Sequence, residues 1–249
     1  MSRVSSFLKP GELVVCLGGG EWGAKAARIA KNNKANAIII DRDARCLAAE
    51  ATDAVIGEQD LGKPDIQGVN LYLGDAVGAL IVILEVATRA WVIPAIQGGF
   101  SGQLIERWLS AKHVEVIRSG KLVNDALQGL PPKLVFSANR GLGTIITSYM
   151  PPQIKCKPDC LAPKKCPVTG RRKISPMYEL LEFSVCEVVD YYWIFATKPL
   201  GGIGGIPGSE VKKALEDIGK LTPPYSLAVG TSCRCHGLVD FFEVRLPNA

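Results

Sequence analysis

Short apolar runs alternate with longer amphipathic segments through the first half of the chain. Such runs, bounded by glycine and polar residues, are typical of strands buried inside a parallel sheet. They predict strands at residues 12–17, 37–40, 53–57, 71–74, 90–96, 113–120 and 133–139.

Helical periodicity fills the segments between these strands. Near the first of them, Trp22 and Ala26 fall on one apolar stripe, whereas Lys25 faces outward. Similar patterns predict helices at residues 74–89, 101–112 and 121–130. Strands that alternate with helices predict an α/β fold, with a Rossmann-like, doubly wound and mostly parallel sheet over residues 1–150.

A glycine-rich turn joins the first predicted strand to the first helix. Gly18, Gly20 and Gly23 have G-x-G-x-x-G spacing, and Asp41 closes the second strand. The first glycine permits a tight turn, the second lets the backbone approach a pyrophosphate, and the third lets the helix pack closely. An acid at the end of the second strand accepts hydrogen bonds from a ribose. This arrangement predicts a dinucleotide or another adenosine-containing ligand; a turn that binds nothing is the alternative.

The segment LVVCLGGGEWGAKAARIAKNNKANAIIIDRD resembles the NAD(P)-binding Rossmann superfamily. It is similar to the regulatory nucleotide-binding domains of potassium transporters and to the dehydrogenases of siroheme synthesis. The resemblance covers residues 12–57 and implies that Gly18, Gly20, Gly23 and Asp41 contact the cofactor.

The identity of that cofactor is open at two positions. Arg42 follows Asp41 and is suited to a 2′-phosphate, so NAD and NADP are both alternatives. S-adenosylmethionine methyltransferases share the layout but usually carry an acid two residues before the first loop glycine. Cys16 stands there in this chain, which disfavours a methyltransferase without excluding it.

Two more glycine-rich loops follow predicted strands. Residues 96–104 and 139–146 each read as a strand-to-helix connection, with Arg140 and Thr144 in the second. Ligands of open α/β sheets bind beyond the carboxyl ends of the strands, so all three loops are candidates for one cleft. Helix capping and tight turns are the simpler interpretation of each additional loop.

The pattern changes at Pro151 and Pro152, which favour a domain boundary. Residues 178–198 predict a helical turn and a long strand, residues 198–210 a glycine-rich loop, residues 209–220 a helix, and residues 225–246 two strands around a loop. This order predicts a smaller cysteine-rich α+β domain over residues 151–249.

Cysteines cluster in that second part of the chain. Cys156, Cys160 and Cys166 lie within eleven residues, and Cys233 and Cys235 precede His236. Three ligands from one loop and a fourth from a distant segment are typical of a [4Fe–4S] cluster, and a proline after the third cysteine is frequent there. Cys233 is the first choice for the fourth ligand and Cys235 the second, because residues two apart in an extended segment face the same side.

Zinc and metal-free thiols are the alternatives to a cluster. A structural zinc site needs four ligands, and Cys233, Cys235 or His236 would complete the set, although the five-residue gap before Cys166 is loose for a zinc knuckle. Cys186 falls in the predicted long strand, where a thiol behaves as a small buried hydrophobe. A disulfide is disfavoured in a reducing compartment.

Basic side chains surround the cysteines and offset thiolate charge. They are Lys155, Lys157, Lys164, Lys165, Arg171, Arg172 and Lys173. They suit a small anionic substrate or an acidic electron carrier. Nucleic acid is disfavoured because no aromatic residues interleave with the charges for base stacking.

Composition narrows the class of protein. The 249 residues are 47% apolar and carry a net charge of +5, as expected for one or two globular domains. No secretory signal begins the sequence, and the most apolar stretch contains Glu85 and Arg89, so we expect a soluble, cytoplasmic protein without a membrane span. Two histidines and no G-x-S-x-G motif disfavour serine hydrolase chemistry.

These patterns together favour an NAD(P)-linked oxidoreductase-like protein that combines a dinucleotide site with a [4Fe–4S] cluster. A non-catalytic nucleotide or redox sensor, or an assembly protein, with structural zinc is the rival hypothesis. The substrate stays open, as does self-association into a homo-oligomer.

Overall fold

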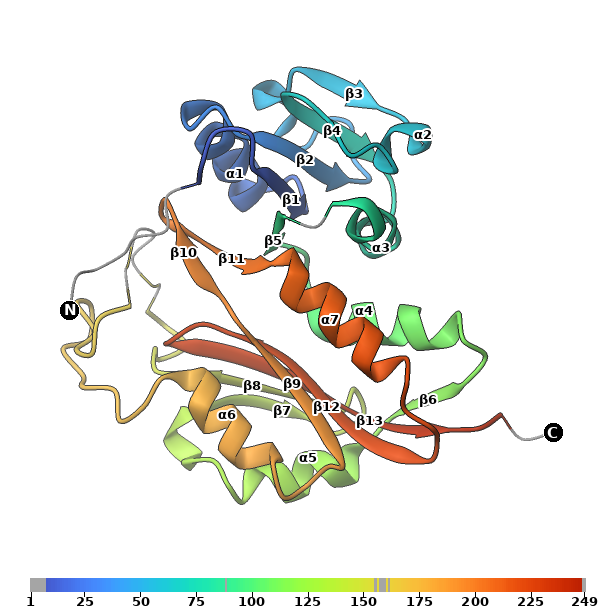
Figure 1. Ribbon diagram of the computed structural model, residues 1–249. Coiled ribbons are helices and arrows are strands. Elements are labelled where there is room, and N and C mark those ends of the chain that lie inside the picture. The colour runs from blue at the N-terminus through green and yellow to red at the C-terminus, as the bar shows by residue number, and fades with distance from the viewer. Residues whose placement is uncertain (1–7, 88, 155, 157–159, 161, 248–249) are drawn as a thin grey trace. The chain divides into compact units, whose positions relative to one another are not determined.

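The computed structural model describes residues 8–87, 89–154, 156, 160 and 162–247 and has a mixed α/β fold with two sheets (Figure 1). The chain forms two compact units. Unit 1 consists of Met1–Gln97 and Lys198–Ala214, and unit 2 of Gly98–Thr197 and Leu215–Ala249. The boundary predicted after residue 150 therefore falls inside unit 2, because the chain already leaves unit 1 at Gln97 and later returns to it.

Five strands of unit 1 are parallel, and their order along the sheet is β5-β1-β2-β4-β3. Their bounds are β1 Leu13–Leu17, β2 Asn36–Asp41, β3 Ala54–Ile56, β4 Val69–Leu73 and β5 Ala90–Pro94. Two strands from the later part of the chain extend this sheet: β11 (Ile203–Pro207) pairs antiparallel with β5, and β10 (Lys198–Leu200) pairs with β11. The predicted strands of this region are confirmed, with bounds that differ by one or two residues.

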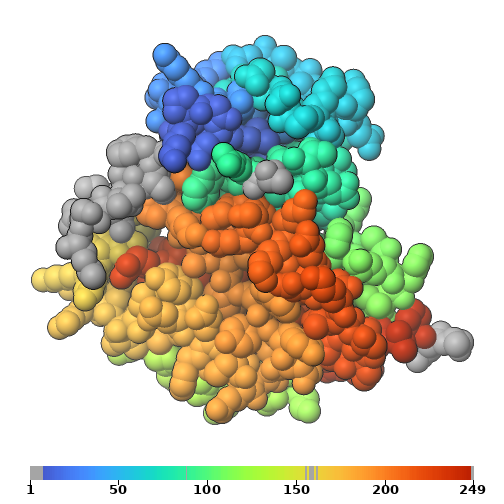
Figure 2. All heavy atoms as spheres, in the orientation of Figure 1, coloured from blue at the N-terminus to red at the C-terminus, as the bar shows by residue number. Residues whose placement is uncertain are grey.

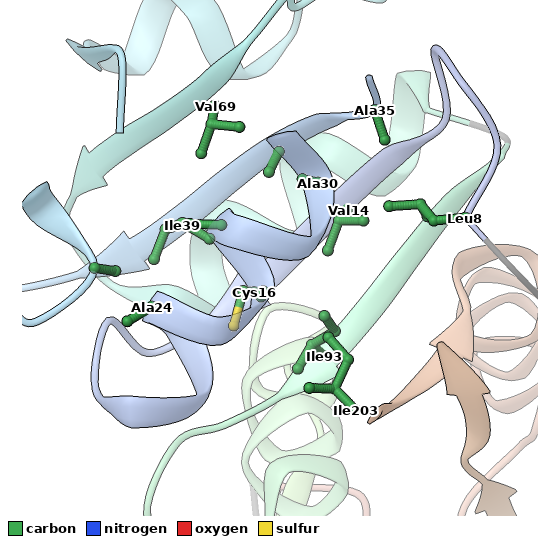
Figure 3. Packing of buried hydrophobic residues seen from close by; sticks show 14 of the residues in the cluster. Leu8, Val14, Cys16, Ala24, Ala30, Ala35, Ile39, Val69, Ile93 and Ile203 are labelled. Carbon is green, nitrogen blue, oxygen red and sulfur yellow. The ribbon is translucent and has the colours of Figure 1, made fainter. Parts of the chain in front are cut away.

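Helix α1 (Glu21–Asn32) covers one face of this sheet through small side chains. Its Ala26, Ala27 and Ala30 are buried among Val14, Cys16 and Ile39 of the strands (Figure 3). Alanine lets the helix axis come close to the sheet and costs little side-chain entropy. Trp22, expected on the same apolar stripe, is instead 45% exposed, and the ammonium of Lys25 lies over its ring.

Helix α3 (Ala76–Val86) packs against β1 and β2 on the opposite face, since its buried Leu80 and Ile83 do not belong to the cluster around α1. The side chain of Asp75 caps it by accepting a hydrogen bond from the Gly78 N–H. The short α2 (Glu58–Leu61) and η1 (Ala49–Ala51) complete this part of unit 1.

The sheet of unit 2 is built on β13 (His236–Arg245), which pairs antiparallel with β12, β8 and β6. The other strands are β6 Glu115–Arg118, β7 Val135–Asn139, β8 Thr144–Ser148, β9 Tyr191–Ala196 and β12 Tyr225–Ser232. The long strands β12 and β13 alternate their side chains between two covered faces. Consecutive residues such as Phe241 and Phe242 are therefore both buried.

Helices cover both faces of this second sheet (Figure 1). On one face, α5 (Gly120–Leu127) and α6 (Met177–Val185) pack Val123, Met177 and Leu181 against Phe241 of β13. Helix α4 (Phe100–Ser110) contacts β12 and β13 from the other face. Helix α7 (Gly208–Ile218) begins in unit 1 and ends in unit 2, and η2 (Pro132–Leu134) precedes β7.

Two predicted strands of the parallel sheet lie elsewhere. Residues 115–118 and 135–139 are strands, as expected, but β6 pairs antiparallel with β13, and β7 with β8, in the second sheet. Hydrophobic periodicity identifies a strand but not its partner. The partner of β6 is more than a hundred residues further along the chain, whereas β7 pairs with the strand that follows it.

Three local predictions are wrong. Residues 198–210 were expected as a loop but form β10 and β11, joined by Gly201 and Gly202 with positive φ. Residues 139–146 form the β7–β8 hairpin and not a strand-to-helix connection. Cys186, expected inside a strand, is the exposed C-cap of α6, because that helix runs one turn further than its pattern indicates.

Among the described residues, no helix is long and apolar enough to cross a bilayer. Their longest helix, α1, has 12 residues, and about 20 are needed to span the hydrocarbon core.

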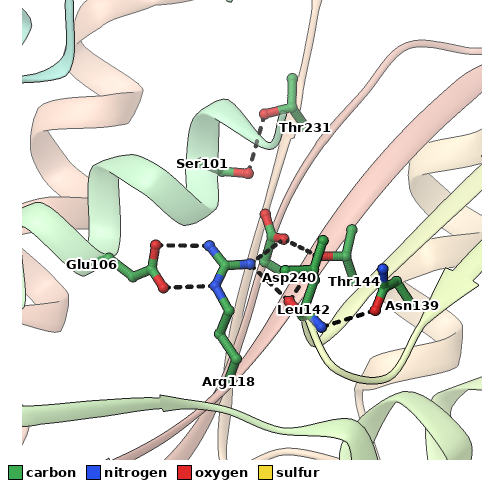
Figure 4. Close-up of polar contacts among 8 residues, drawn as sticks. All are labelled: Ser101, Glu106, Arg118, Asn139, Leu142, Thr144, Thr231 and Asp240. Atoms are coloured by element: carbon green, nitrogen blue, oxygen red, sulfur yellow. Dashed lines mark hydrogen bonds and ion pairs between the residues drawn. The ribbon is translucent and has the colours of Figure 1, made fainter. Parts of the chain in front are cut away.

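A buried carboxylate, Asp240, ties β13 to its neighbours (Figure 4). Its Oδ1 accepts hydrogen bonds from Thr144 Oγ1 at 2.6 Å and from Arg118 Nη1 at 3.2 Å. Arg118 also binds Glu106 through two hydrogen bonds of 2.7 Å. Within the described part of the chain, Asp240 Oδ2 has no partner. Burial raises the pKa of Asp240, and the bonds from Thr144 and Arg118 oppose that rise.

Replacing Gly23 should destabilise unit 1. A Cβ at Gly23 would lie 2.2 Å from the Gly18 carbonyl oxygen, a backbone atom that has no rotamer to escape into. Gly23→Ala should lower the free energy of unfolding by about 1–3 kcal/mol despite alanine's better helix propensity. Gly20→Ala is the control, since nothing lies within 4 Å of its Cβ, and it should cost no more than about 1 kcal/mol. Urea unfolding measures both, and equal losses would contradict the steric explanation.

Asp240 should make stability fall as pH rises. A carboxyl whose pKa is higher in the folded than in the unfolded protein binds more protons when folded, so folding is favoured at low pH. The advantage is complete below the unfolded pKa of about 3.9 and is lost as pH rises through the folded value. Urea unfolding of the wild type and of Asp240→Asn across this range should show the wild type losing stability relative to the variant. A constant difference between the two would be inconsistent with a raised pKa.

Candidate functional site

The glycine-rich turn after β1 has a backbone that only glycine accommodates. Gly18 has φ +113°, and a Cβ there would lie 2.7 Å from the Ala95 carbonyl oxygen. Its N–H donates to the Ile40 carbonyl at 2.8 Å, which fastens the turn to the end of β2. The turn is therefore held on both sides, by β2 and by the residue that follows β5.

The other two glycines of the motif have different surroundings. Gly23 lies directly against the Gly18 carbonyl, so the first turn of α1 packs on the loop itself. Gly20 is the N-cap of α1, and no atom of the described residues lies within 4 Å of its Cβ position. Nor does any of their side chains cap this helix. The start of α1 thus combines open space with N–H groups that lack an acceptor within the helix.

Asp41, at the end of β2, holds the loop with its carboxylate. Its Oδ2 accepts from the Gly19 N–H at 2.6 Å, and its Oδ1 accepts from the Asp43 N–H at 2.9 Å. Each oxygen keeps a second lone pair. Arg42 is 81% exposed at its side chain and pairs with Asp75 at 3.3 Å.

The loop lies at a switch point of the sheet. From β1 the chain passes through α1 to β2 on one side, and from β4 it passes through α3 to β5 on the other side of β1. Strand order therefore reverses between β1 and β5, where open parallel sheets bind ligands beyond the carboxyl ends of the strands. All of these residues belong to unit 1.

The cysteine loop of unit 2 joins β12 to β13. The Sγ of Cys233 accepts hydrogen bonds of 3.3 Å from the N–H groups of Cys235 and His236, and it lies 3.6 Å from His236 Nδ1. A hydrogen bond from the Cys235 thiol and the two N–H groups lower the pKa of Cys233 to about 6 against the effect of burial. The same thiol–thiolate bond raises the pKa of Cys235, and burial raises it further.

Two more cysteines have backbone donors at their sulfurs. Thr169 N–H points at Cys166 Sγ at 3.5 Å, and Ala162 N–H donates to Cys160 Sγ at 3.3 Å. The turn that begins at Cys166 is closed by a hydrogen bond from the Gly170 N–H to the Cys166 carbonyl. Against the effect of burial, hydrogen bonds from Thr169 and Val168 lower the pKa of Cys166. The thiolate is the form that binds metals.

Some of the predicted metal ligands interact with one another, but they do not form a ligand set among the described residues. Electrostatic interactions join Cys156 to Cys233, and join Cys166 and Cys235 to His236. Among the described residues, however, no three or more His, Cys, Asp or Glu side chains are placed as one ligand set. The shared centre of Cys156, Cys160 and Cys166 stays a prediction, and Lys155 and Lys157 lie outside the described residues.

Lys173 is a site residue that the sequence pattern does not single out from its basic neighbours. It is only 8% exposed, its ammonium contacts the Pro163 carbonyl, and it forms a hydrogen bond with Cys235. Its positive charge helps to lower the pKa of Cys166 and opposes the rise in the pKa of Cys235. Cys16 of unit 1 differs: burial raises its pKa to about 12, which leaves it a neutral thiol.

Comparisons with known proteins connect the chain to one family. The family model AF_1314_C, described as uncharacterized protein, C-terminal domain, matches residues 103–245. A protein of Archaeoglobus fulgidus, described as an uncharacterized protein, is 26% identical over 225 residues, which cover 90% of this chain and 96% of that relative. Among solved structures, N5-carboxyaminoimidazole synthetase from Staphylococcus aureus, complexed with ADP, aligns with a TM-score of 0.27 and 16% identity, over 57% of this chain and 39% of that one.

Proposed function

The chain belongs to the AF_1314_C family, and we propose that it is an NAD(P)-linked redox protein whose unit 1 is a Rossmann-like nucleotide-binding domain. The observation that carries the proposal is the glycine loop at the reversal of strand order in a parallel sheet. The close contact of Gly23 with Gly18, and the open space at Gly20, match the separate tasks of these glycines in a dinucleotide site.

The chemistry of the loop suits a pyrophosphate. The uncapped start of α1 presents N–H donors and the positive end of a helix dipole. The carboxylate of Asp41, already fixed by two backbone N–H groups, keeps lone pairs for ribose hydroxyls.

Arg42 and Cys16 bear on which nucleotide binds. NADP would take Arg42 away from Asp75, an ion pair of exposed side chains that costs little to break. NAD would leave that pair intact. S-adenosylmethionine is the less favoured ligand, since Cys16, where methyltransferases usually carry an acid, is a buried thiol that donates to the Gly18 carbonyl at 3.5 Å.

The thiols of unit 2 would supply the second half of the redox function. A [4Fe–4S] cluster or zinc is held by cysteine sulfurs, and hydrogen bonds to those sulfurs tune a cluster. Backbone N–H groups lie at the sulfurs of Cys160, Cys166 and Cys233. This cysteine-rich unit would then exchange electrons with a small-molecule substrate or an acidic carrier. The ligand set itself is not assembled among the described residues.

A nucleotide sensor with structural zinc is the second candidate, and one distance favours it. Cys233 Sγ and His236 Nδ1 lie 3.6 Å apart. A sulfur at about 2.3 Å and a nitrogen at about 2.1 Å from one tetrahedral zinc ion are also separated by about 3.6 Å. Cys233 and His236 would be two ligands. Cys156, which interacts electrostatically with Cys233, and Cys166, which interacts with His236, are candidates to complete the set.

Nucleotide binding is tested by calorimetry with NADH, NADPH and S-adenosylmethionine on the intact chain. Gly20→Val should abolish binding, because a side chain in the open space blocks the close approach of a phosphate. Asp41→Ala should weaken binding by about 1.5–3 kcal/mol through lost bonds to a charged group. Gly62→Val is the control: it too fills open space in unit 1, but outside the loop, and should leave affinity unchanged. If the wild type binds none of the three ligands, the proposal fails.

Metal content of chain purified without oxygen tests the thiol centre. Cys233→Ser should lose the bound metal, because it removes a sulfur that two backbone N–H groups hold in place. Cys186→Ser, at the exposed end of α6, should retain it. Iron with a brown absorption identifies a cluster, and zinc without colour identifies the structural site. Wild-type protein that contains neither metal would contradict both the cluster and the zinc site and would support metal-free thiols.

A further inference from the structure

A cavity of about 390 Å³ opens in unit 2 beside the cysteine loop. It is lined by Lys164, Arg172, Lys173, Ile174, Ser175, Pro176 and Arg234. Of the seven described residues that line it, four are cationic and none is acidic. Figure 2 shows the yellow segment that contains residues 164–175 at the molecular surface.

The four cations have no carboxylate counter-ion in the described part of the chain. No carboxylate there forms an ion pair with Lys164, Arg172, Lys173 or Arg234, whereas Arg118, Lys198 and other basic residues are paired. Like charges around one hollow repel one another and raise the local concentration of anions. An anion that enters the hollow relieves this repulsion.

The start of helix α6 adds to these charges. Its N-cap, Pro176, lines the cavity, and among the described residues no side chain caps the helix. The Met177 N–H donates to the Arg234 carbonyl at 3.2 Å, which joins the helix start to the cysteine loop. The positive end of the helix dipole therefore lies at the cavity.

The cavity walls are fixed before any ligand arrives. Lys173 N–H donates to the Lys164 carbonyl at 2.9 Å, and the Tyr149 hydroxyl donates to the Ser175 carbonyl at 2.8 Å. The buried Lys173 ammonium uses two of its three donors on Pro163 and Cys235. One N–H therefore remains for a ligand. Fixed donors lower the entropy cost of binding.

We propose that this cavity binds a phosphate-bearing small molecule. Arginine recognises phosphate oxygens with two parallel bonds, lysine binds them as a point charge, and the positive end of a helix attracts them. A volume of about 390 Å³ lies within the range of about 300–1,000 Å³ usual for small-molecule sites. The proposal uses no residue of unit 1 and does not depend on nucleotide binding there.

Calorimetry with inorganic pyrophosphate on the full chain tests this site. Lys164→Gln and Arg172→Gln should each weaken binding about tenfold, because each removes a charge-assisted bond. Lys165→Gln is the matched control: it is exposed, adjacent in sequence and outside the cavity, and it changes the net charge equally. Lys165→Gln should bind as tightly as the wild type.

The same pyrophosphate measurements, repeated on chains that also carry Gly20→Val, separate this site from the loop of unit 1. If Gly20→Val does not fold, the measurements on chains without it decide the test. Binding that survives Gly20→Val but weakens with Lys164→Gln supports the cavity, whatever the outcome for NAD(P). No pyrophosphate binding, or equal weakening by Lys164→Gln and Lys165→Gln, overturns the proposal. So does binding of single-stranded RNA without binding of pyrophosphate, because a nucleic-acid surface would then explain the charge.

Discussion

The contact between the Gly18 carbonyl and the Cα of Gly23 sets the geometry of unit 1. The helix comes this close to the loop only because Gly23 has no side chain, since a Cβ there would lie 2.2 Å from the Gly18 carbonyl oxygen. The contact places the start of α1 against the carboxyl end of β1. The alanines of α1 then pack against β1 and β2. The loop, the helix dipole and the alanine-lined core are therefore consequences of one steric condition.

That condition is local in sequence, which explains why it could be predicted. The strand at 12–17, the spacing of Gly18, Gly20 and Gly23, and Asp41 at the next strand end all lie within about one βαβ unit. Each feature has a signature that neighbouring residues alone produce. Asp41 adds a detail that spacing does not show, since its carboxylate holds the loop through the Gly19 N–H.

Strand partners and side-chain clusters were harder to predict from the sequence because they depend on distant segments. The periodicity of residues 135–139 indicates a strand, but only the position of β8 and β13 makes it part of an antiparallel sheet. Residues 203–207 contain two glycines and a proline, which disfavour a strand. They nevertheless form β11, because they pair with the edge of β5. The burial of Lys173 among cysteines from two segments likewise follows from tertiary packing.

The return of the chain to unit 1 has a consequence for synthesis on the ribosome. Residues up to Gln97 contain every parallel strand of the first sheet, but the strand that covers β5 ends only at Pro207. Between those points the ribosome adds about one hundred residues, which at about 5–20 residues per second takes on the order of 5–20 seconds. During that interval the edge of β5 exposes unpaired N–H and C=O groups to other nascent chains. The first unit is thus completed by a segment made after most of the second.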